Sequence, residues 1–375
     1  MTRTRRHAWH TSSFLPSNHE PARPSQNQTI ATGACRVRRV RGMERLQGAI
    51  LAAGMGARLR PLTDERPKPL VTVGGVSLLE YAIDALAGLS ISTLGINLYH
   101  RAEQIPGALS HRREHIEYVF ETTLEGTGGG LRGITQRLPR GTVVVLNGDA
   151  FFDFDLHAAV AAHRRSGAMA TLVLRAPLAH ETFGRVAVDA TDQIQRIAEV
   201  NGPEPDREDL RFGVFTGVQI VEPALLDALP AVGPCDVLRT AYARRLSERA
   251  RIVGHFVDEP CVWLDVGTLD RYLDAQDAVL AGARAETAKL PAADGQGRRV
   301  HAQAQIDRTA ELVGPCAILE GAIVEAGSRI GPGCVIEAGA RVTRGSRLLR
   351  TVVWSGATAS GAHEGAVVRP TQSAS

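Results

Sequence analysis

Apolar residues follow two kinds of spacing along the first three quarters of the chain. Short apolar runs, which are typical of buried strands, occupy residues 49–52, 94–98, 143–146 and 171–174. Segments with apolar residues at helical spacing lie among and after these runs, at residues 77–89, 155–165, 235–250 and 270–281. The first of them opens with Ser77 and Glu80, whose spacing fits a capping box at a helix start. Strands that alternate with helices predict an α/β domain with a mostly parallel sheet over residues 46–282.

A six-residue repeat replaces these patterns near the C-terminus. Its aliphatic position is filled without interruption by Ile306, Leu312, Ile318, Val324, Ile330, Ile336, Val342 and Leu348. Two further sets keep the same register: the small residues Cys316, Ala322, Ser328, Cys334, Ala340 and Ser346, and the glycines Gly321, Gly327, Gly333, Gly339 and Gly345. Three hexads can form the sides of a triangular coil, with the aliphatic residue inside and glycine in the turn. The pattern resembles the hexapeptide-repeat proteins and predicts a left-handed β-helix of fewer than three full coils over residues 304–370, after a linker at residues 283–303.

The N-terminal segment differs in composition from the rest of the chain. Residues 1–42 are rich in Arg, Ser, Pro and Thr and show no periodicity, so we expect residues 1–45 to be a disordered N-terminal extension. A transit peptide and an over-extended gene start both fit, and Met43 just before the first strand favours the second. Part of the net charge of +3 comes from this segment, so the sequence predicts no basic groove and no nucleic-acid partner.

The cysteines and histidines show no metal-binding pattern. The five cysteines have no CxxC spacing, which is typical of reduced thiols in a cytoplasmic protein. His111 and His115 are four residues apart but lack a third ligand, and we expect them at the surface. No apolar run is long enough to cross a bilayer, so we expect no membrane insertion.

The loop after the first strand has the features of a phosphate site. The strand ends in Leu51-Ala52-Ala53 and continues into Gly54 and Gly56, which expose backbone N–H groups where an open α/β sheet binds its ligand. Arg58 and Lys68 add positive charge suited to a triphosphate. The loop is not a Walker A motif, because no Gly-Lys-Ser/Thr follows. It is not a dinucleotide fingerprint either, because Leu59 replaces the third glycine.

The longer pattern, Gly-x-Gly-x-Arg-x-x-Pro-Leu-Thr followed by Pro-Lys-Pro, resembles the opening motif of the sugar-1-phosphate nucleotidyltransferases, or sugar-nucleotide pyrophosphorylases. The resemblance extends through most of residues 47–280. It implies a Rossmann-like nucleotidyltransferase domain that forms an NDP-sugar and pyrophosphate from an NTP and a sugar 1-phosphate.

The resemblance also implies the site residues. Nucleotide contacts are expected from Leu51, Ala52, Ala53, Gly54, Gly56, Glu121, Gly126, Thr127 and Gly128. The sugar phosphate is expected at Asn147, Gly148, Thr216 and Gly217. Mg²⁺ is expected on Asp149 and Asp265, and catalysis on Arg58, Lys68 and Asp149. The simpler alternatives are a strand-end turn residue for Asp149, a helix cap for Asp265 and a solvated loop residue for Lys68.

One departure from the family concerns the sugar phosphate. Many members place a second lysine in a Glu-Lys-Pro segment, and here Val200 occupies that position, after Glu199. Either another cation serves the sugar phosphate or this subgroup needs none.

The resemblance leaves the substrate pair open. Residues 125–130 resemble the N-acetylmuramate 1-phosphate uridylyltransferases, whereas the appended β-helix resembles the mannose-1-phosphate guanylyltransferases. We expect GTP with mannose 1-phosphate first, and UTP with N-acetylmuramate 1-phosphate or another sugar 1-phosphate next.

Two other classes of function are open to the sequence. A non-catalytic regulatory or scaffold relative should have lost its charged site residues, yet all of them are present. An acyltransferase β-helix would need a basic histidine beside the coil, and only His363 lies late in the repeat. We therefore expect the β-helix to pack subunits into a homo-oligomer.

Overall fold

The computed structural model describes residues 46–370 except 180, 182 and 289. The expected disordered extension, residues 1–45, lies outside the described residues. The described chain from residue 46 onward belongs to one compact unit. Within it, no helix combines the length and apolar character needed to span a bilayer.

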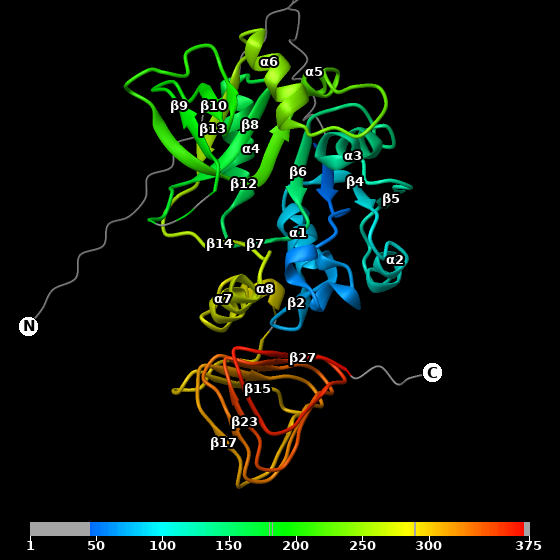
Figure 1. Cartoon of the computed structure of the whole chain (residues 1–375), viewed down its shortest axis with the longest axis vertical. Coiled ribbons are helices and arrows are strands. Elements are labelled where there is room, and N and C mark those ends of the chain that lie inside the picture. Colours follow the sequence, from blue (N-terminus) through cyan, green and yellow to red (C-terminus); the bar gives the residue numbers. More distant parts are fainter. Residues whose placement is uncertain (1–45, 180, 182, 289, 371–375) are drawn as a thin grey trace, which may run out of the picture. The chain divides into compact units, whose positions relative to one another are not determined.

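A ten-stranded sheet forms the centre of the first domain (Figure 1). Its parallel core has the order β6-β1-β4-β5, with bounds Val143–Asn147, Leu46–Leu51, Ile91–Leu98 and Ile116–Phe120. In this core Leu51 is paired with Asn97 on one side and with Asn147 on the other. The carboxyl ends of three strands therefore meet at one edge, which is where an open α/β sheet binds its ligand.

The remaining strands complete the sheet with mixed directions. They are β8 (Ala170–Arg175), β9 (Arg185–Val188), β10 (Ile194–Ile197), β11 (Val200–Asn201), β12 (Arg211–Val221) and β13 (Ile252–Phe256). β12 runs antiparallel to β6, β8 and β9, and β13 runs parallel to β8. The predicted α/β fold with a parallel core is confirmed, and the antiparallel strands lie on one side of that core.

Helices and short elements connect the strands. The α-helices are α1 (Leu78–Ala87), α2 (Gln104–Ala108), α3 (Gly126–Thr135), α4 (Leu156–Ser166), α5 (Pro223–Leu226), α6 (Ala243–Ser247), α7 (Leu269–Leu280) and α8 (Ala285–Ala288). One π-helical turn covers Leu238–Tyr242, and 3-10 turns cover Ala57–Leu59, Leu62–Asp64 and Lys68–Leu70. Two small antiparallel pairs complete the domain: the hairpin of β2 (Thr72–Val73) and β3 (Val76–Ser77), and the long-range pair of β7 (Ala150–Phe152) and β14 (Trp263–Asp265).

The predicted capping box is confirmed at the start of α1. The Glu80 backbone N–H donates to Ser77 Oγ at 3.2 Å, and the Ser77 N–H donates to Glu80 Oε2 at 3.2 Å. Both donors would otherwise lack a partner at the helix start. The box holds α1 with its apolar face, including Leu79 and Ile83, buried against the sheet.

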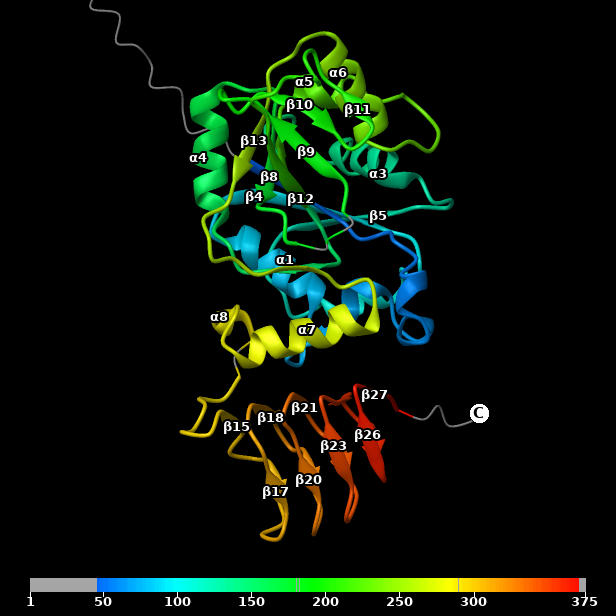
Figure 2. The ribbon, with the colours of Figure 1, turned by 60° about the vertical axis from the view of Figure 1, so that its left-hand side comes forward.

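The C-terminal repeat folds into a β-helix of three parallel sheets (Figure 2). The first sheet contains β15 (Arg298–Val300), β18 (Cys316–Ile318), β21 (Cys334–Ile336), β24 (Val352–Val353) and β27 (Val367–Val368). The second contains β16 (Gln305–Ile306), β19 (Ile323–Val324), β22 (Arg341–Val342) and β25 (Thr358–Ala359). The third contains β17 (Glu311–Leu312), β20 (Arg329–Ile330), β23 (Arg347–Leu349) and β26 (Ala362–Glu364).

The side chains of the repeat lie as the pattern predicts, but the coil count was too low. The aliphatic residues of the repeat from Ile318 to Leu348 are buried, and its five in-register glycines, from Gly321 to Gly345, have φ between 65° and 73°. The sheets hold four or five strands, where fewer than three coils were expected. Ile318 pairs with Ile336 but Leu348 pairs with His363, so the late coils are shorter and no longer keep the six-residue spacing.

Candidate active site

A cavity of about 260 Å³ opens at the carboxyl ends of β1, β4 and β6. Its lining residues are Leu51, Ala52, Ala53, Gly54, Lys68, Pro69, Asn97, Leu124, Gly126, Thr127, Asn147 and Asp149. Most of the residues predicted to contact the nucleotide are therefore on one surface, together with two of the predicted catalytic residues. The other predicted nucleotide residues, Gly56, Glu121 and Gly128, are not part of this lining.

The first wall of the cavity is the loop that leaves β1. The Ala52 N–H donates to Asn97 Oδ1 at 2.9 Å, and the Gly148 N–H donates to Leu51 O at 2.9 Å. Gly148 allows this close approach, because a Cβ there would lie 2.8 Å from Ile50 Cγ2. Gly56 has φ 61° and faces Thr63, so it shapes the turn that brings the chain to Arg58.

The second wall is the glycine-rich start of α3. The Gly128 N–H donates to Cys235 O at 2.9 Å, and a Cβ on Gly128 would lie 2.7 Å from Cys235 Sγ. Thr127 Oγ1 donates to Asp236 Oδ2 at 3.0 Å and accepts from the Val237 N–H at 3.0 Å. Gly126 and Gly128 are needed here because the segment around Cys235 packs directly against the helix start.

A hydrogen-bonded bridge joins the two walls, and it includes a residue that the sequence analysis missed. Asn97 Nδ2 donates to Glu121 Oε1 at 2.7 Å, and Glu121 Oε2 accepts from the Glu125 N–H at 2.9 Å. A Cβ on Gly130 would lie 2.2 Å from Asn97 Nδ2, so glycine makes room for the bridge. The available signal was a lone polar residue near the end of the apolar run at 94–98.

Four charged side chains converge beside the cavity. Lys68 Nζ lies 2.7 Å from Asp149 Oδ2 and 3.3 Å from Asp265 Oδ1, and Arg58 lies 3.2 Å from Asp265 Oδ2. Lys68 is 4% exposed, whereas the Arg58 side chain is 70% exposed and free to reach toward a ligand. These residues come from three parts of the chain, namely the loop after β1, Asp149 after β6 and Asp265 at the end of β14, and the fold brings together all four that were predicted to carry the chemistry.

The two carboxylates fit the chemistry of a divalent metal site. Both reach one cation, the Lys68 ammonium, so their oxygens lie no further apart than the two contact distances combined. Mg²⁺ is commonly held by one or two carboxylates together with substrate phosphates. Among the described residues, no group of three or more His, Cys, Asp or Glu side chains forms a metal site on its own. A magnesium ion held by these two carboxylates would take its remaining ligands from water or substrate phosphates.

The residues expected at the sugar phosphate lie beside Asn147. Gly217 has φ 81° at the point where the β12 register shifts, and a Cβ there would lie 2.6 Å from Asn147 Nδ2. Glycine at this position therefore leaves space for the Asn147 side chain. Thr216 is buried in the sheet, its hydroxyl donates to Val173 O at 2.9 Å, and its carbonyl accepts from Trp263 Nε1 at 2.7 Å.

An arginine cluster lies next to Trp263 and was not foreseen. Arg175, at the end of β8, is buried against Glu181, and its guanidinium carbon lies 4.8 Å from the Trp263 ring centroid. Although burial opposes the charged form, the hydrogen bond from Arg175 holds the pKa of Glu181 below its usual value. Arg271 in α7 lies 3.7 Å from the same carboxylate. Val200, which occupies the position of the missing family lysine, lies on β11.

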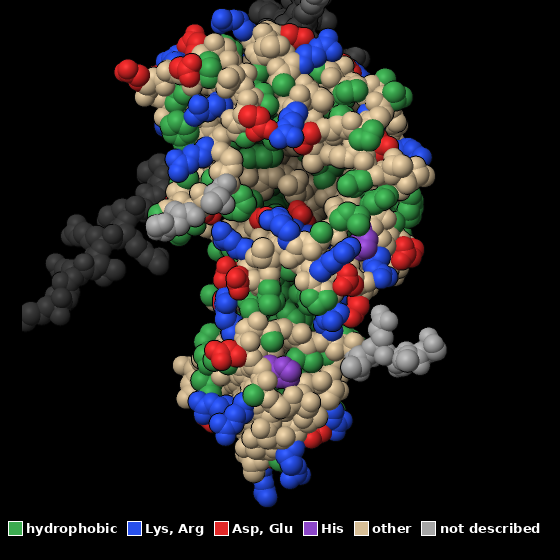
Figure 3. Space-filling model, viewed as in Figure 1, with side chains coloured by type: hydrophobic (Ala, Val, Ile, Leu, Met, Phe, Trp, Pro, Cys, Tyr) green, Lys and Arg blue, Asp and Glu red, His purple; other side chains and the backbone are tan. Residues whose placement is uncertain are grey.

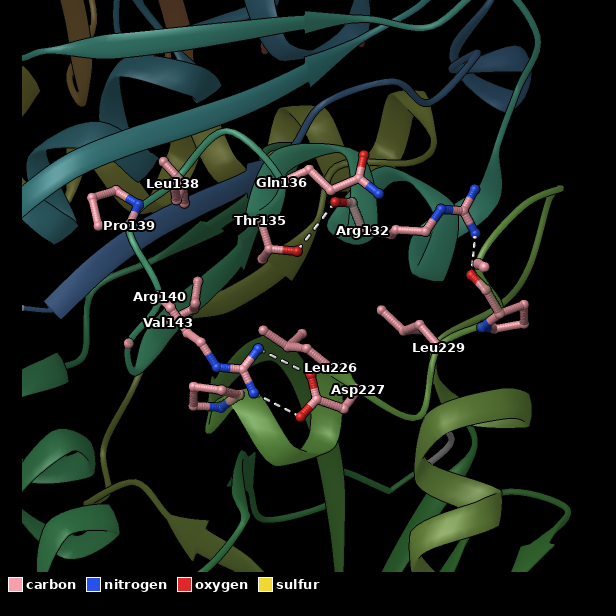
Figure 4. A pocket seen from close by; sticks show the side chains of 14 residues that line it. Arg132, Thr135, Gln136, Leu138, Pro139, Arg140, Val143, Leu226, Asp227 and Leu229 are labelled. Carbon is pink, nitrogen blue, oxygen red and sulfur yellow. Dashed lines mark hydrogen bonds and ion pairs between the residues drawn. The ribbon is translucent and has the colours of Figure 1, made fainter.

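A second cavity, of about 300 Å³, lies on the other side of α3 (Figure 4). Arg132 donates to Pro230 O at 2.8 Å, and Arg140 lies 2.7 Å from Asp227 Oδ2. Both guanidinium groups along this cavity are therefore already paired. Arg132 also lies 3.0 Å from the Glu125 carboxylate, and the Glu125 N–H donates to Glu121. The second cavity is therefore connected through Glu125 to the wall of the nucleotide cavity.

Two histidines expected at the surface are exposed, and two cysteines of the hexad repeat are buried. His111 and His115 have side chains 58% and 69% exposed and pair with glutamates. Cys316 and Cys334 are buried in the β-helix, where burial raises the pKa of Cys316 to about 12 and that of Cys334 to about 11. Thiols with such pKa values are protonated at neutral pH and serve here as small interior residues.

Comparison with known proteins decides the family. The family model described as "Nucleotidyl transferase" matches residues 47–282, which contain the cavity and all four converging charges. The chain belongs to the nucleotidyl transferase family. In Figure 3, basic and acidic side chains lie beside a hollow of this nucleotidyltransferase.

Three relatives are similar over most of their length. A UTP–glucose-1-phosphate uridylyltransferase from Synechocystis sp. is 28% identical, covering 77% of this chain and 85% of its own. A mannose-1-phosphate guanylyltransferase from Mycobacterium tuberculosis is 28% identical, covering 77% of each chain. A probable mannose-1-phosphate guanylyltransferase 2 from Arabidopsis thaliana is 26% identical, covering 76% of this chain and 80% of its own.

Proposed function

We propose that this nucleotidyltransferase joins a nucleoside triphosphate to a sugar 1-phosphate and releases pyrophosphate, with GTP and mannose 1-phosphate as its pair. One observation carries the reaction class: Lys68, Asp149, Asp265 and Arg58 converge beside a cavity lined by strand ends and a glycine-rich helix start. The relatives named above transfer nucleotides to sugar 1-phosphates, which supports the same chemistry here.

The residues divide the work by position. The nucleotide lies along the cavity, with its base between the Ala52–Gly54 loop and the start of α3, and its phosphates toward Lys68. A sugar-phosphate oxygen attacks the α-phosphorus in line, and the P–O bond to pyrophosphate breaks. A phosphate monoester is already anionic at neutral pH, so the attack requires no general base. The enzyme supplies positioning and charge.

Lys68 and Arg58 have different tasks in this proposal. Lys68 is buried and fixed by two carboxylates, so it places a positive charge beside the α-phosphate without reorganisation. Arg58 is exposed and pairs with Asp265 beside Gly267, so it can turn to hold the leaving pyrophosphate. Asp149 and Asp265 would hold Mg²⁺, which supplies Lewis-acid charge neutralisation at the phosphates when bound.

The Glu121 carboxylate supports guanine as the base. The carboxylate is not part of the cavity lining but bonds to Asn97, which is, so in this proposal the base meets a hydrogen-bond acceptor next to Asn97. A carboxylate only accepts hydrogen bonds, and guanine presents two adjacent N–H donors on its pairing edge, whereas uracil presents one donor between two carbonyls. UTP remains the alternative, because the Synechocystis relative is named for it. Its partner would then be N-acetylmuramate 1-phosphate, glucose 1-phosphate or a related sugar.

The first experiment is pyrophosphate release with Mg²⁺ across four NTPs and a panel of sugar 1-phosphates. We expect one strong pair, GTP with mannose 1-phosphate. A strong pair with UTP would keep the reaction and replace the substrates. Silence across the panel from folded protein, with nucleotide binding retained, would instead favour a regulatory relative.

We also propose a cytoplasmic homo-oligomer. The four cysteines within the described residues are free thiols, which fits a reducing compartment where nucleotide sugars can be made. The β-helix supports assembly because its terminal coils offer strand edges for packing between subunits.

A further inference from the structure

The β-helix contacts the two segments of the catalytic domain that carry Lys68 and Asp265. Lys68 begins a 3-10 turn that leads directly into β2, and Asp265 ends β14, which leads through Gly267 into α7. Side chains of the β-helix bond to residues of both segments, within a few positions of the catalytic groups. The apolar cluster that holds Val71, Val266 and Tyr272 also continues into the interior of the β-helix.

The first contact fixes the segment after Lys68. Thr72 Oγ1 donates to Glu337 Oε1 at 2.5 Å, and Glu337 Oε2 accepts from the Ser355 N–H at 2.9 Å. Glu337 follows β21 and is 2% exposed, so it is a buried acidic group committed to this contact. Gln276 of α7, fully buried, donates to Thr72 O at 2.9 Å and accepts from the Gly74 N–H at 2.9 Å.

The second contact fixes the helix after Asp265. Trp354 Nε1 donates to the Tyr272 hydroxyl at 3.0 Å, and both side chains are fully buried. The Arg66 guanidinium carbon lies 3.8 Å from the Trp354 ring centroid, so the same tryptophan also touches the loop just before Lys68. Arg350 adds ion pairs at 2.7 Å to Asp274 and 2.9 Å to Asp277 on the same helix.

Lys68 and Asp265 must keep a defined separation for catalysis, because a misplacement of about 1 Å can cost about a hundredfold in rate. Their own direct contact is a single ion pair of 3.3 Å, longer than the 2.7 Å contact between Lys68 and Asp149. The β-helix instead contacts both segments, through Glu337 on one and Trp354 on the other. We propose that Glu337 and Trp354 are positioning residues, through which the β-helix sets the placement of Lys68 and Asp265 for transfer. The inference rests on the proposed function.

The test separates catalysis from nucleotide binding. Thr72→Val removes the hydroxyl that Glu337 accepts from, and Thr72→Ser restores it. Trp354→Phe removes the indole N–H contact with Tyr272 and shrinks the ring that Arg66 covers, while keeping an aromatic side chain. Most of the nucleotide cavity is lined by the loop after β1, by the ends of β4 and β6 and by the start of α3, which do not carry these contacts, and only Lys68 and Pro69 of the lining belong to the segment before Thr72. We expect Thr72→Val and Trp354→Phe to lower kcat at least about tenfold, with the nucleotide KM within about twofold of the wild type. Thr72→Ser should restore kcat.

A matched control is Arg329→Ala, which removes an exposed ion pair with Glu311 from the outer surface of the β-helix and should leave kcat unchanged. Each variant is first shown to be folded by its thermal unfolding and its nucleotide affinity. Wild-type kcat in folded Thr72→Val and Trp354→Phe would overturn the inference. So would an equal loss in Arg329→Ala or in Thr72→Ser. An inactive wild type would count against the proposed function itself, so the two failures are distinguishable.

Discussion

At the scale of single residues, the site is defined by one buried cation between two carboxylates. Lys68→Ala leaves Asp149 and Asp265 facing each other without the charge that now joins them. Removing a preorganised charge of this kind typically costs about 3 kcal/mol of transition-state stabilisation, or roughly a hundredfold in kcat. We expect Lys68→Ala and Asp149→Ala each to lose at least that much turnover, measured by pyrophosphate release, while unfolding stays cooperative.

The neighbouring arginines provide a matched control for this prediction. Arg58 touches Asp265, whereas Arg60, two residues later, pairs only with Asp64 at the surface. Arg58→Ala should therefore lower kcat strongly, and Arg60→Ala should leave it within about twofold, because exposed ion pairs contribute little. Equal rates in the two arginine variants, or wild-type rates in Lys68→Ala, would contradict the assigned roles.

The bridge between Asn97 and Glu121 allows a second residue-scale prediction. A methyl group at Gly130 would lie 2.2 Å from Asn97 Nδ2, so Gly130→Ala must displace the side chain that also holds the Ala52 N–H. We expect the nucleotide Kd to rise at least about tenfold, since both cavity walls depend on this bridge. The measurement is calorimetric titration with the nucleotide. Gly107→Ala, where a Cβ meets nothing within 4 Å, is the control and should bind normally.

At the scale of elements, the capping box of α1 gives a prediction about stability alone. Ser77→Ala removes the acceptor for the Glu80 N–H and leaves that donor without its partner. We expect the free energy of unfolding to fall by about 1 kcal/mol, measured in urea, with kcat unchanged. Ser110→Ala, at an exposed position beyond α2, should change neither quantity. A large loss of kcat in Ser77→Ala would mean that α1 serves the site directly.

The same elements show which parts of the structure a sequence can predict. The loop from Leu51 to Lys68 is continuous in sequence, so its composition predicted a phosphate site and its neighbours. The hexad repeat likewise predicted the buried positions of the β-helix up to Leu348, because each hexad places an aliphatic residue at the same position inside the coil. Both inferences needed only residues that lie near one another along the chain.

Contacts between distant segments were not predictable in this way. Asn97 becomes a cavity residue only because β4 pairs with β1, and Arg175 becomes a neighbour of Trp263 only because the end of β8 meets the start of β14. Glu337 stands in the repeat like any polar coil residue, and nothing nearby in sequence indicates that Thr72 covers it. The family motif brought Asp149 and Asp265 together in the prediction, whereas spacing alone leaves them more than a hundred residues apart.

At the scale of the whole molecule, Glu337 couples the association of the β-helix with the catalytic domain to pH. Burial raises the pKa of Glu337, against the opposing effects of Thr72, Ser355 and the Arg66 charge. The folded protein therefore keeps a proton that the unfolded chain has already lost, so this group costs stability as pH rises above about 4.3, the usual glutamate value, through its raised pKa.

Glu337→Gln removes this dependence, because an amide does not titrate. We expect the free energy of unfolding of the variant to improve relative to the wild type as pH rises through that window, as measured by urea unfolding at a series of pH values. Glu311→Gln, whose carboxylate is exposed on the outer surface, is the control. Parallel curves for Glu337→Gln and the wild type at every pH would show that the pKa of Glu337 is the same in the folded protein as in the unfolded chain, which contradicts the prediction.

The assembly of subunits is the remaining prediction at this scale. Within residues 46–370, each of the last strands β25, β26 and β27 pairs with a single neighbour, and Leu349 on β23 is an apolar side chain 39% exposed on the outer surface. Exposed strand edges and apolar side chains favour association. We expect the full chain to sediment as a homo-oligomer, and Leu349→Glu to shift it toward monomer, because burying an unpaired charge in an interface is costly. Arg347→Ala, on the same strand and surface, should stay assembled. A monomeric wild type across micromolar concentrations would contradict the expected assembly. The β-helix would then serve only the catalytic domain of its own chain, through the contacts of Glu337 and Trp354.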